Sequence, residues 1–359
     1  MTKLAGRIDK LVKSLKKSRL DFLLVTTPSH LRYLCGFSGS NGLALISGSQ
    51  RLFLTDFRYK DQVKEEVKGF QTQIADRELF TSLSSLKKLP RRKFRLGFEA
   101  KNLSYANYQK IKEVLPKTEL VPTNNLVEEL VAQKEPKELE KIRKAAEIVD
   151  EVFDEIVPQI KPGVSEMDLA AELDYRMKKK GASGSAFEPI VASGYRSALP
   201  HARASSKKLK KGEFVTLDFG AVYDGYVSDL TRTVLLGHAD QKQRKVYSIV
   251  YQAQRRGIAA LEAGKEAKAV DQVAREFIKE KGFGPNFGHG LGHGIGVQVH
   301  ESPILNPRSS DVLKENMVVT IEPGIYISSW GGVRIEDDVL VTSNGPEVLT
   351  SSHNELLEL

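Results

Sequence analysis

Two aspartates that flank a hairpin signal are the first residues whose spacing could do chemistry. Asp218 lies inside an apolar stretch that predicts a strand, where an unpaired carboxylate is costly to bury. The dipeptide Asp224–Gly225 favours a two-residue hairpin turn, which sets Thr231 opposite Asp218 and leaves Asp229 diagonal to it on the same face. Converging carboxylates repel each other unless a proton or a cation lies between them. The pattern predicts a divalent cation; the alternative is that Asp218 caps a loop and Asp229 is exposed.

A glycine-rich segment further along the chain adds imidazoles. His289, His293 and His300 are three of the seven histidines in the chain and fall close together. Glycines alternate with the first two from Gly288 to Gly296, so we expect a loop whose backbone bends tightly and can be approached closely. A lone histidine is more often a core residue, but this cluster indicates a site.

A third segment, residues 318–339, contains two glutamates and an arginine. Glu322 falls inside an apolar pattern that predicts a strand. We expect Gly331–Gly332 to turn the chain back, so that Arg334 and Glu336 alternate onto one face of the returning strand. An ion pair between Arg334 and Glu336 at a sheet edge is the alternative, but it leaves Glu322 unexplained.

Together the three segments supply four carboxylates and at least one imidazole. This oxygen-rich set suits Mn²⁺, Co²⁺ or Zn²⁺, and Cys35, the single cysteine, cannot build a thiolate site. Four carboxylates are too many for one ion and predict two, which typically lie about 3.5–4 Å apart and lower the pKa of a shared water. The chemistry they indicate is hydrolysis.

The composition sets the class of protein. A length of 359 residues suits two domains, and 40% hydrophobic with 28% charged residues is typical of a soluble globular chain. No apolar run reaches the roughly 18–20 residues that span a bilayer, and the N-terminus lacks a signal-peptide pattern, so we expect a cytoplasmic protein without a membrane partner. The net charge of +8 is spread along the chain without interleaved aromatics, which argues against nucleic acid as a partner.

The elements that position these side chains fall into two parts. The first part alternates short strands and helices, which predicts an α/β layer with a mixed or parallel sheet. Polar breakers precede Pro136, which with Glu138 is a good helix start. We therefore predict an N-terminal domain of residues 1–127 and a catalytic domain of residues 128–359.

In the second part the pattern predicts an α+β domain. A long helix is expected from Pro136 to about Ile160 and another from the cap at Ser165 to about Lys180, with two more over 241–261 and 270–279. Strands are expected over 213–222, 226–236, 317–328 and 333–341. We expect the helices on one side of a largely antiparallel sheet.

At this point the residues resemble a known family, the pita-bread metallopeptidases, in the branch that contains Xaa-Pro aminopeptidase (aminopeptidase P) and Xaa-Pro dipeptidase (prolidase). The similar segments span residues 135–345: the Asp218–Asp229 spacing, HGIG around His293, EPGIY from Glu322 and VRIED around Glu336. The resemblance implies that these five residues hold two divalent metals, most often Mn²⁺, with Co²⁺ or Zn²⁺ as alternatives. It also implies a C-terminal pita-bread catalytic domain behind a smaller α/β creatinase-like N-terminal domain.

The same resemblance implies roles for further residues. His201, in the segment SGYRSALPHARAS, corresponds to an active-site histidine beside the metals, and His300 to one that contacts the substrate carbonyl. His289 is similar to a histidine near the proton path, and Glu322 to the residue that carries the proton. Arg334 is similar to an arginine that orients ligands and borders the substrate pocket.

The first domain resembles that of short bacterial aminopeptidase P-type enzymes at His30–Gly42 and Phe53–Tyr59, which implies oligomer contacts and a homodimer. We therefore expect a dinuclear metallo-aminopeptidase that removes the first residue from peptides with proline in second place. The alternative is an Xaa-Pro dipeptidase, which must bind the carboxylate of the proline; the sequence does not identify the group that would do so.

Three other functions fit less well. Methionine aminopeptidase is disfavoured by the additional N-terminal domain, and creatinase by the retention of all five ligand positions. A non-enzymatic pita-bread protein that binds protein or nucleic acid would suit the basic charge, but such proteins usually lose ligands.

Overall fold

The computed structural model describes residues 3–76, 78–86, 89–90 and 92–359. The chain divides into two compact units, one up to Val131 and one from Ala132. The domain boundary that the sequence predicts, between residues 127 and 128, stays a prediction. Within the described part of the chain, no helix combines the length and the apolar character that crossing a membrane requires.

The first unit is built on one mixed sheet, as the sequence predicts. Its strand order is β4-β3-β2-β1-β5-β6. The β1–β2 and β2–β3 pairs are antiparallel, whereas β3–β4, β1–β5 and β5–β6 are parallel. The strands are β1 Phe22–Val25, β2 Gly42–Ile46, β3 Arg51–Thr55, β4 Gln71–Ile74, β5 Phe94–Glu99 and β6 Thr118–Thr123.

Helices accompany this sheet, and several of them are short. The helices are α1 Lys3–Lys17, α2 Pro28–Cys35, α3 Gln62–Glu66, α4 Leu79–Ser82, α5 Tyr105–Val114 and α6 Glu128–Ala132. The pattern did not predict α2, α4 or α6, because these helices have only eight, four and five residues and are too short to show a helical hydrophobic period. A distant residue fixes the start of α2, because the buried Glu99 carboxylate accepts hydrogen bonds from the backbone of Thr26 and Thr27 at 2.6 and 2.8 Å.

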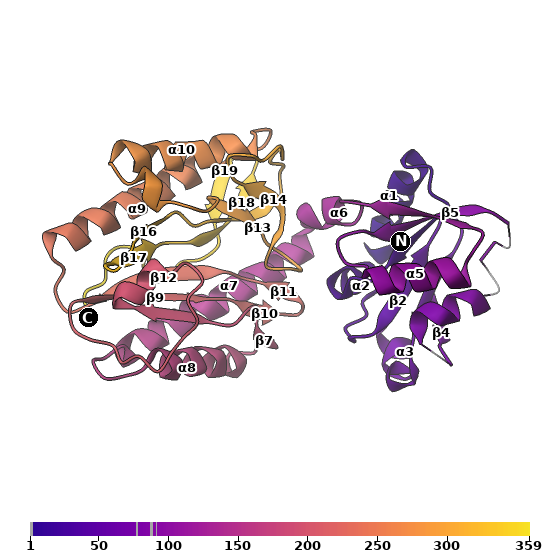
Figure 1. Cartoon of the computed structure of the whole chain (residues 1–359), viewed down its shortest axis with the longest axis horizontal. Helices are drawn as coiled ribbons and strands as arrows, with labels where there is room; N and C mark the ends of the chain where they lie inside the picture. The colour runs from indigo at the N-terminus through magenta and orange to yellow at the C-terminus, as the bar shows by residue number, and fades with distance from the viewer. Residues whose placement is uncertain (1–2, 77, 87–88, 91) are drawn as a thin grey trace. The chain divides into compact units, whose positions relative to one another are not determined.

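Two pairs of helices enclose the strands of the second unit. They are α7 Pro136–Ile156 with α8 Glu166–Lys179, and α9 Gln241–Ala259 with α10 Ala267–Glu280. Figure 1 shows α7 and α8 on one side of the strands and α9 and α10 on the other. The expectation that all helices lie on one side of a single sheet was therefore wrong. The strands form several separate sheets, and a helix pair covers each main group.

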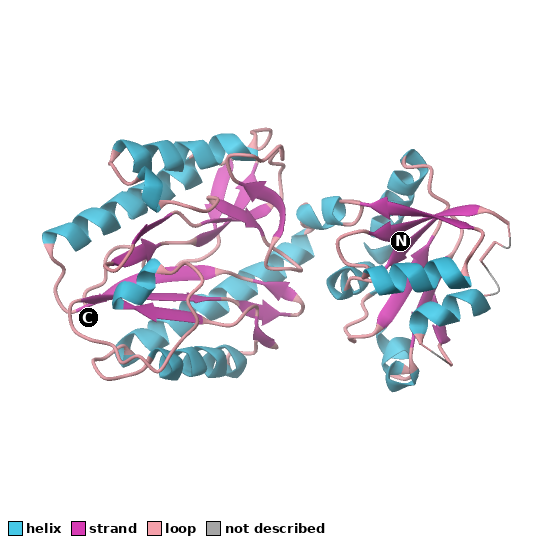
Figure 2. Ribbon diagram, viewed as in Figure 1, coloured by secondary structure: helices cyan, strands magenta, loops and turns pink. Residues whose placement is uncertain are grey.

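All strand pairs described in the second unit are antiparallel (Figure 2). The sheets have the orders β12-β9-β8, β11-β10-β7, β14-β13-β15-β18-β19 and β16-β17. The strands are β7 Gly184–Ser185, β8 Ile190–Ser193, β9 Glu213–Phe219, β10 Ala221–Tyr223, β11 Tyr226–Val227, β12 Leu230–Leu236, β13 Gly292–Gly294, β14 Glu301–Leu305, β15 Val318–Ile321, β16 Gly324–Ile327, β17 Gly331–Arg334, β18 Asp337–Thr342 and β19 Gly345–Val348.

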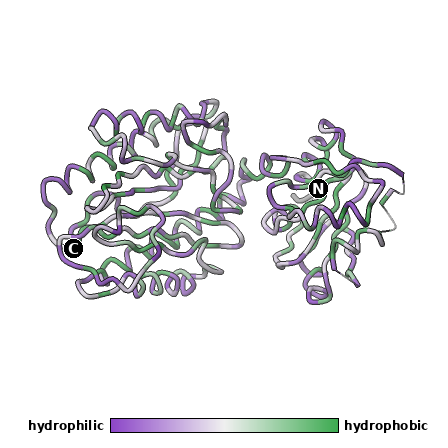
Figure 3. Tube along the Cα trace, in the orientation of Figure 1, coloured by the Kyte–Doolittle hydropathy of each residue, from purple (hydrophilic) through white to green (hydrophobic). Residues whose placement is uncertain are grey.

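The helices of this unit are amphipathic, and their apolar faces build two cores. In Figure 3 hydrophobic and hydrophilic residues alternate along them, as expected of helices that cover a sheet. One core joins α7 and α8 to β8, β9 and β12, and the other joins α9 and α10 to strands from β14 to β18. The polar residues considered next lie among these strands.

Candidate metal centre

Glu322 and Glu336 lie where two neighbouring chain segments pass from one sheet to another. β15 pairs with β18 in the five-stranded sheet, and β16 pairs with β17 in the two-stranded sheet. Glu322 lies between β15 and β16, and Glu336 lies between β17 and β18. Both carboxylates therefore occupy the same break in the strand pairing. The expectations of Glu322 within a strand and a turn at Gly331–Gly332 were wrong, because Glu322 follows β15 and the turn occupies residues 328–330.

Asp218 and Asp229 are placed by the predicted hairpin. Asp224 and Gly225 both have positive φ, 45° and 77°, as a two-residue hairpin turn requires. Thr231 pairs with Asp218 across β9 and β12, which confirms the predicted register. Asp229 directly precedes β12. Asp218 is 8% exposed and Asp229 is 5% exposed, so both carboxylates are buried.

His293 points one ring nitrogen at these carboxylates. It lies on the short strand β13, not in the loop that its glycine neighbours predicted. Its Nδ1 lies 3.1 Å from the carbonyl oxygen of Gly294, which can only accept, so Nδ1 carries the proton. Nε2 is then free to accept or to bind a cation, and it lies 3.9 Å from Oδ2 of Asp229 and 3.4 Å from Oε1 of Glu322.

These side chains form a cluster that could hold a metal ion. Asp229, His293 and Glu336 each offer a ligand atom, and the three atoms lie within 4.8 Å of one another. Glu322 joins the cluster through its contact with His293. Asp218 is turned toward Arg334, whose Nη2 donates to Oδ2 over 2.5 Å. All five residues line one cavity of about 510 Å³.

The electrostatics of the cluster fit a cation. Burial, reinforced by Glu336, raises the pKa of Asp229 well above its usual value, and burial likewise raises the pKa of Glu322 to about 8. Burial and the charge of Glu322 do the same for Glu336. Oδ1 of both Asp218 and Asp229 is buried without a hydrogen-bond partner among the described residues. Divalent cations would satisfy these oxygens and offset the mutual repulsion of the carboxylates.

A hydroxyl and a guanidinium orient the carboxylates. Oγ1 of Thr231 donates to Oε2 of Glu336 over 2.5 Å and accepts from Nε of Arg334 over 3.1 Å. Nη1 of Arg334 donates to Oη of Tyr326 over 2.9 Å. Sequence reasoning identified Arg334 but gave no functional role to Thr231 or Tyr326. Thr231 could have been found, because it is the residue paired with Asp218.

The three other predicted histidines line the same cavity. His289 donates from Nδ1 to the carbonyl of Gly290 over 2.8 Å, so its Nε2, 3.0 Å from Oη of Tyr326, accepts. Burial lowers the pKa of His289 to about 4, in agreement with a neutral ring. The His300 ring lies 4.3 Å from that of His293, and burial lowers its pKa too. His201 is exposed at the cavity wall.

A buried carboxylate anchors the loop that contains His201. Oε1 of Glu166 accepts from the backbone N–H and the hydroxyl of Ser193, at 2.8 and 2.9 Å. Oε2 accepts from the backbone N–H and the hydroxyl of Ser205, at 3.1 and 2.6 Å, and from Nε of Arg196 at 2.9 Å. Both ends of the loop, residues 193–205, are thus tied to one side chain. Sequence reasoning missed this residue.

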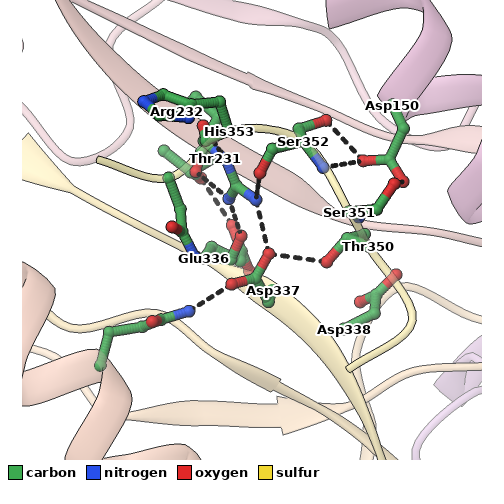
Figure 4. A network of polar contacts seen from close by, with 12 residues as sticks. Asp150, Thr231, Arg232, Glu336, Asp337, Asp338, Thr350, Ser351, Ser352 and His353 are labelled. Atoms are coloured by element: carbon green, nitrogen blue, oxygen red, sulfur yellow. Dashed lines mark hydrogen bonds and ion pairs between the residues drawn. The ribbon is translucent and has the colours of Figure 1, made fainter. Parts of the chain in front are cut away.

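A second buried network of hydrogen bonds includes the backbone carbonyl of Glu336 (Figure 4). Arg232, 1% exposed, donates from Nη2 to Oδ1 of Asp337 over 2.6 Å and from Nη1 to the carbonyl of Glu336 over 2.5 Å. The neighbouring Asp338 accepts from the backbone N–H of Asp229 at 3.0 Å. The backbones that position two of the cluster carboxylates are therefore held by buried ionic groups.

Comparison with known proteins identifies the class to which this fold and cluster belong. The chain matches metallopeptidase family M24 over residues 140–343 and the creatinase/prolidase N-terminal domain over residues 7–130. It is therefore a member of metallopeptidase family M24, and the expected family and pita-bread fold are confirmed.

Relatives that match nearly the whole chain include Xaa-Pro dipeptidases and an X-Pro aminopeptidase. The Xaa-Pro dipeptidase of Pyrococcus furiosus is 39% identical over 353 residues, 98% of this chain and 99% of the relative. The solved Xaa-Pro dipeptidase of Bacillus anthracis has a TM-score of 0.95 and 43% identity, and the match covers 99% of this chain and 100% of the other. The solved X-Pro aminopeptidase of Thermotoga maritima has a TM-score of 0.90 and 38% identity, and the match covers 98% of this chain and 99% of the other.

Proposed function

We propose that the chain is an Xaa-Pro dipeptidase, a metal-dependent hydrolase that splits dipeptides ending in proline. The observation that supports hydrolysis most is the buried set of Asp229, His293 and Glu336, whose ligand atoms lie within 4.8 Å of one another at a cavity. We propose dipeptidase specificity in place of the aminopeptidase specificity that the sequence analysis favoured. The reason is that the Pyrococcus relative and the Bacillus structure, which the chain matches over nearly their full lengths, are named Xaa-Pro dipeptidases. Xaa-Pro aminopeptidase remains the second candidate, supported by the Thermotoga structure.

Two divalent metal ions complete the proposed site. Asp218, Asp229, His293, Glu322 and Glu336 would hold them, with Mn²⁺ as the first choice and Co²⁺ or Zn²⁺ as alternatives, because these residues offer oxygen and nitrogen but no sulfur. When bound, such ions polarise a carbonyl and lower the pKa of water. The orphaned, buried Oδ1 atoms of Asp218 and Asp229 support this assignment.

The protein side chains then move protons and position the substrate. Glu322 accepts a proton at Oε1 from the attacking water and delivers it to the departing proline nitrogen, as a general base and then a general acid. His300 and His201 donate to the scissile carbonyl oxygen as negative charge develops there. His289 and Arg334 hold Tyr326 between them, which keeps this wall of the cavity fixed.

The shape of the cavity suits a proline residue. Its wall includes several apolar side chains, namely Phe187, Pro189, Ile190, Pro200, Val299 and Ile304. Proline brings an apolar ring and has no backbone N–H, so a bound Xaa-Pro bond requires no acceptor from the wall at that position. The polar groups are concentrated instead at the metal cluster and the histidines.

The test compares two substrates. The Mn²⁺-loaded protein is given Ala-Pro and Ala-Pro-Ala, and released alanine is measured over time. Fast release from Ala-Pro with little from the tripeptide is the expected result. Release from the tripeptide alone would show an aminopeptidase, and release from neither would contradict both candidates.

The proposal extends to the state of the protein. We place it in the cytoplasm as a homodimer that acts on small peptides, without a nucleic-acid or membrane partner. The dispersed charge and the creatinase-like first unit support this assignment. Light scattering coupled to size exclusion tests the dimer directly, and a monomeric mass at assay concentrations would contradict it.

A further inference from the structure

The guanidinium groups of Arg203 and Arg334 line the cavity, and they differ in whether other side chains of the protein bind them. Arg334 is 4% exposed and donates to Asp218, Thr231 and Tyr326. Arg203, by contrast, is exposed, and its side chain makes no hydrogen bond or ion pair with the residues that the structure describes. Its guanidinium donors are therefore available to a ligand in the cavity.

The backbone that presents Arg203 is nevertheless fixed. The carbonyl of Arg203 accepts from Nη2 of Arg196 over 2.5 Å, and Arg196 is itself held by the buried Glu166. The preceding residue, Ala202, is 5% exposed and donates its N–H to Leu199 over 3.2 Å. A cation on a fixed backbone binds an anion with less loss of conformational entropy than one on a mobile loop.

The charges of the cavity determine which ligand group needs this cation. Glu188 and the four carboxylates of the metal cluster line the cavity, and its other walls are largely apolar. An Xaa-Pro dipeptide bears its carboxylate on the proline itself, whereas a longer peptide has a neutral amide there. A carboxylate that leaves water for such a wall requires a cationic hydrogen-bond donor, and a guanidinium can bind it through two parallel bonds.

We propose that Arg203 binds the C-terminal carboxylate of the substrate and so makes the site selective for dipeptides over longer peptides. The inference rests on the proposed dipeptidase function. It supplies the group that the sequence analysis could not identify. Arg203 acts on binding, not on the bond-breaking step, because the carboxylate it contacts is not at the scissile bond.

The test uses two substrates that differ only at this carboxylate. Ala-Pro and alanyl-prolinamide share the scissile bond, but the amide has a neutral end. With the Mn²⁺-loaded protein, Arg203→Ala should raise KM for Ala-Pro about tenfold or more, the effect of losing a charge-assisted hydrogen bond. Its kcat for Ala-Pro and its kcat/KM for alanyl-prolinamide should stay within about twofold of the wild type, because the metal cluster is untouched.

Two further variants sharpen the comparison. Arg203→Lys keeps the charge but loses the paired donors, so its KM for Ala-Pro should fall between those of the wild type and Arg203→Ala. Arg255→Ala removes an exposed arginine of α9 that does not line the cavity, and it should leave KM and kcat unchanged for both substrates.

The outcomes separate this inference from the proposed function. If Arg203→Ala loses equal kcat/KM on both substrates, or loses none on either, the role of Arg203 would be overturned while the proposed dipeptidase function would stand. A wild-type protein that cleaves alanyl-prolinamide as well as Ala-Pro would overturn it in the same way. A wild type that cleaves only longer peptides would overturn both proposals.

Discussion

Thr231 donates its hydroxyl hydrogen to Oε2 of Glu336 over 2.5 Å, from the strand position that pairs with Asp218. Oγ1 of Thr231 also accepts from Nε of Arg334, and Nη2 of Arg334 in turn donates to Asp218. A neutral hydroxyl thus sits between a carboxylate and a guanidinium and sets the direction of both. Groups that orient metal ligands in this way typically change metal affinity about 10–100-fold when they are removed.

Replacing Thr231 tests this arrangement. Thr231→Val keeps the shape but removes the hydrogen bonds, so we expect Mn²⁺ affinity to fall about tenfold. Thr231→Ser retains the hydroxyl and should bind Mn²⁺ nearly as well as the wild type. Isothermal titration calorimetry of the metal-free proteins measures both. Equal affinity for all three proteins would show that the hydroxyl does not position Glu336.

Glu322→Gln should stop turnover without unfolding the protein. The change removes a proposed ligand and the group that moves the proton, so kcat on Ala-Pro should fall by about a hundredfold or more. Thermal unfolding of the metal-free variant should match or exceed that of the wild type, because a neutral amide avoids the burial cost of the charge. Activity within a few-fold of the wild type would rule out the assigned role.

The stability gained from metal should grow with pH. Without a cation, burial raises the pKa of Glu322 from 4.5 to about 8, and the pKa values of Asp229 and Glu336 also rise. The folded metal-free protein therefore binds more protons than the unfolded chain in this window, so its stability falls as pH rises from about 4.5 to about 8. Bound metal replaces those protons and removes the penalty.

Calorimetry with Mn²⁺ or with a chelator checks this prediction. We expect a larger increase in Tm on adding Mn²⁺ at about pH 8 than at about pH 5. An increase that is the same at both values, or larger at the lower one, would contradict the raised pKa values. Activity should disappear on chelation and return when Mn²⁺ is added back.

Asp337→Ala should destabilise the second unit strongly. The substitution leaves the guanidinium of Arg232 buried without its carboxylate, which typically costs about 3–5 kcal/mol of unfolding free energy. Glu347→Ala removes the partner of Arg143 in an exposed pair and should cost less than about 1 kcal/mol. Urea unfolding of both variants gives the comparison. Similar losses of unfolding free energy in the two variants would show that the buried pair of Arg232 and Asp337 stabilises the fold no more than an exposed pair.

Local patterns made much of the cluster predictable from the sequence. The register of Thr231 with Asp218 follows from a two-residue turn whose type is set by Asp224 and Gly225. The candidate ligands were located because charged residues interrupt apolar stretches. The family resemblance then joined segments that are far apart along the chain.

Features that depend on distant contacts were not predictable in this way. The apolar pattern runs through Glu322 almost without a break, so it does not show that the chain changes sheets there. Pro323 was the available signal, because proline cannot donate to a strand ladder. Glu166 looks like an ordinary acidic residue in the first turn of a helix. Its partners at Ser193 and Ser205 follow 27 and 39 positions later, beyond the reach of any local period.

Glu166 holds the two ends of the loop over residues 193–205 and the side chain of Arg196, and the backbone N–H of Gly332 donates to the buried hydroxyl of Ser197 in its middle, so the loop backbone is fixed. Tyr195, Leu199 and Arg203 are exposed on this fixed backbone and make no hydrogen bond with Glu166. If Arg203 has the role proposed for it, a change at this one exposed side chain would redirect substrate preference over evolution while the loop backbone and His201 stay in place.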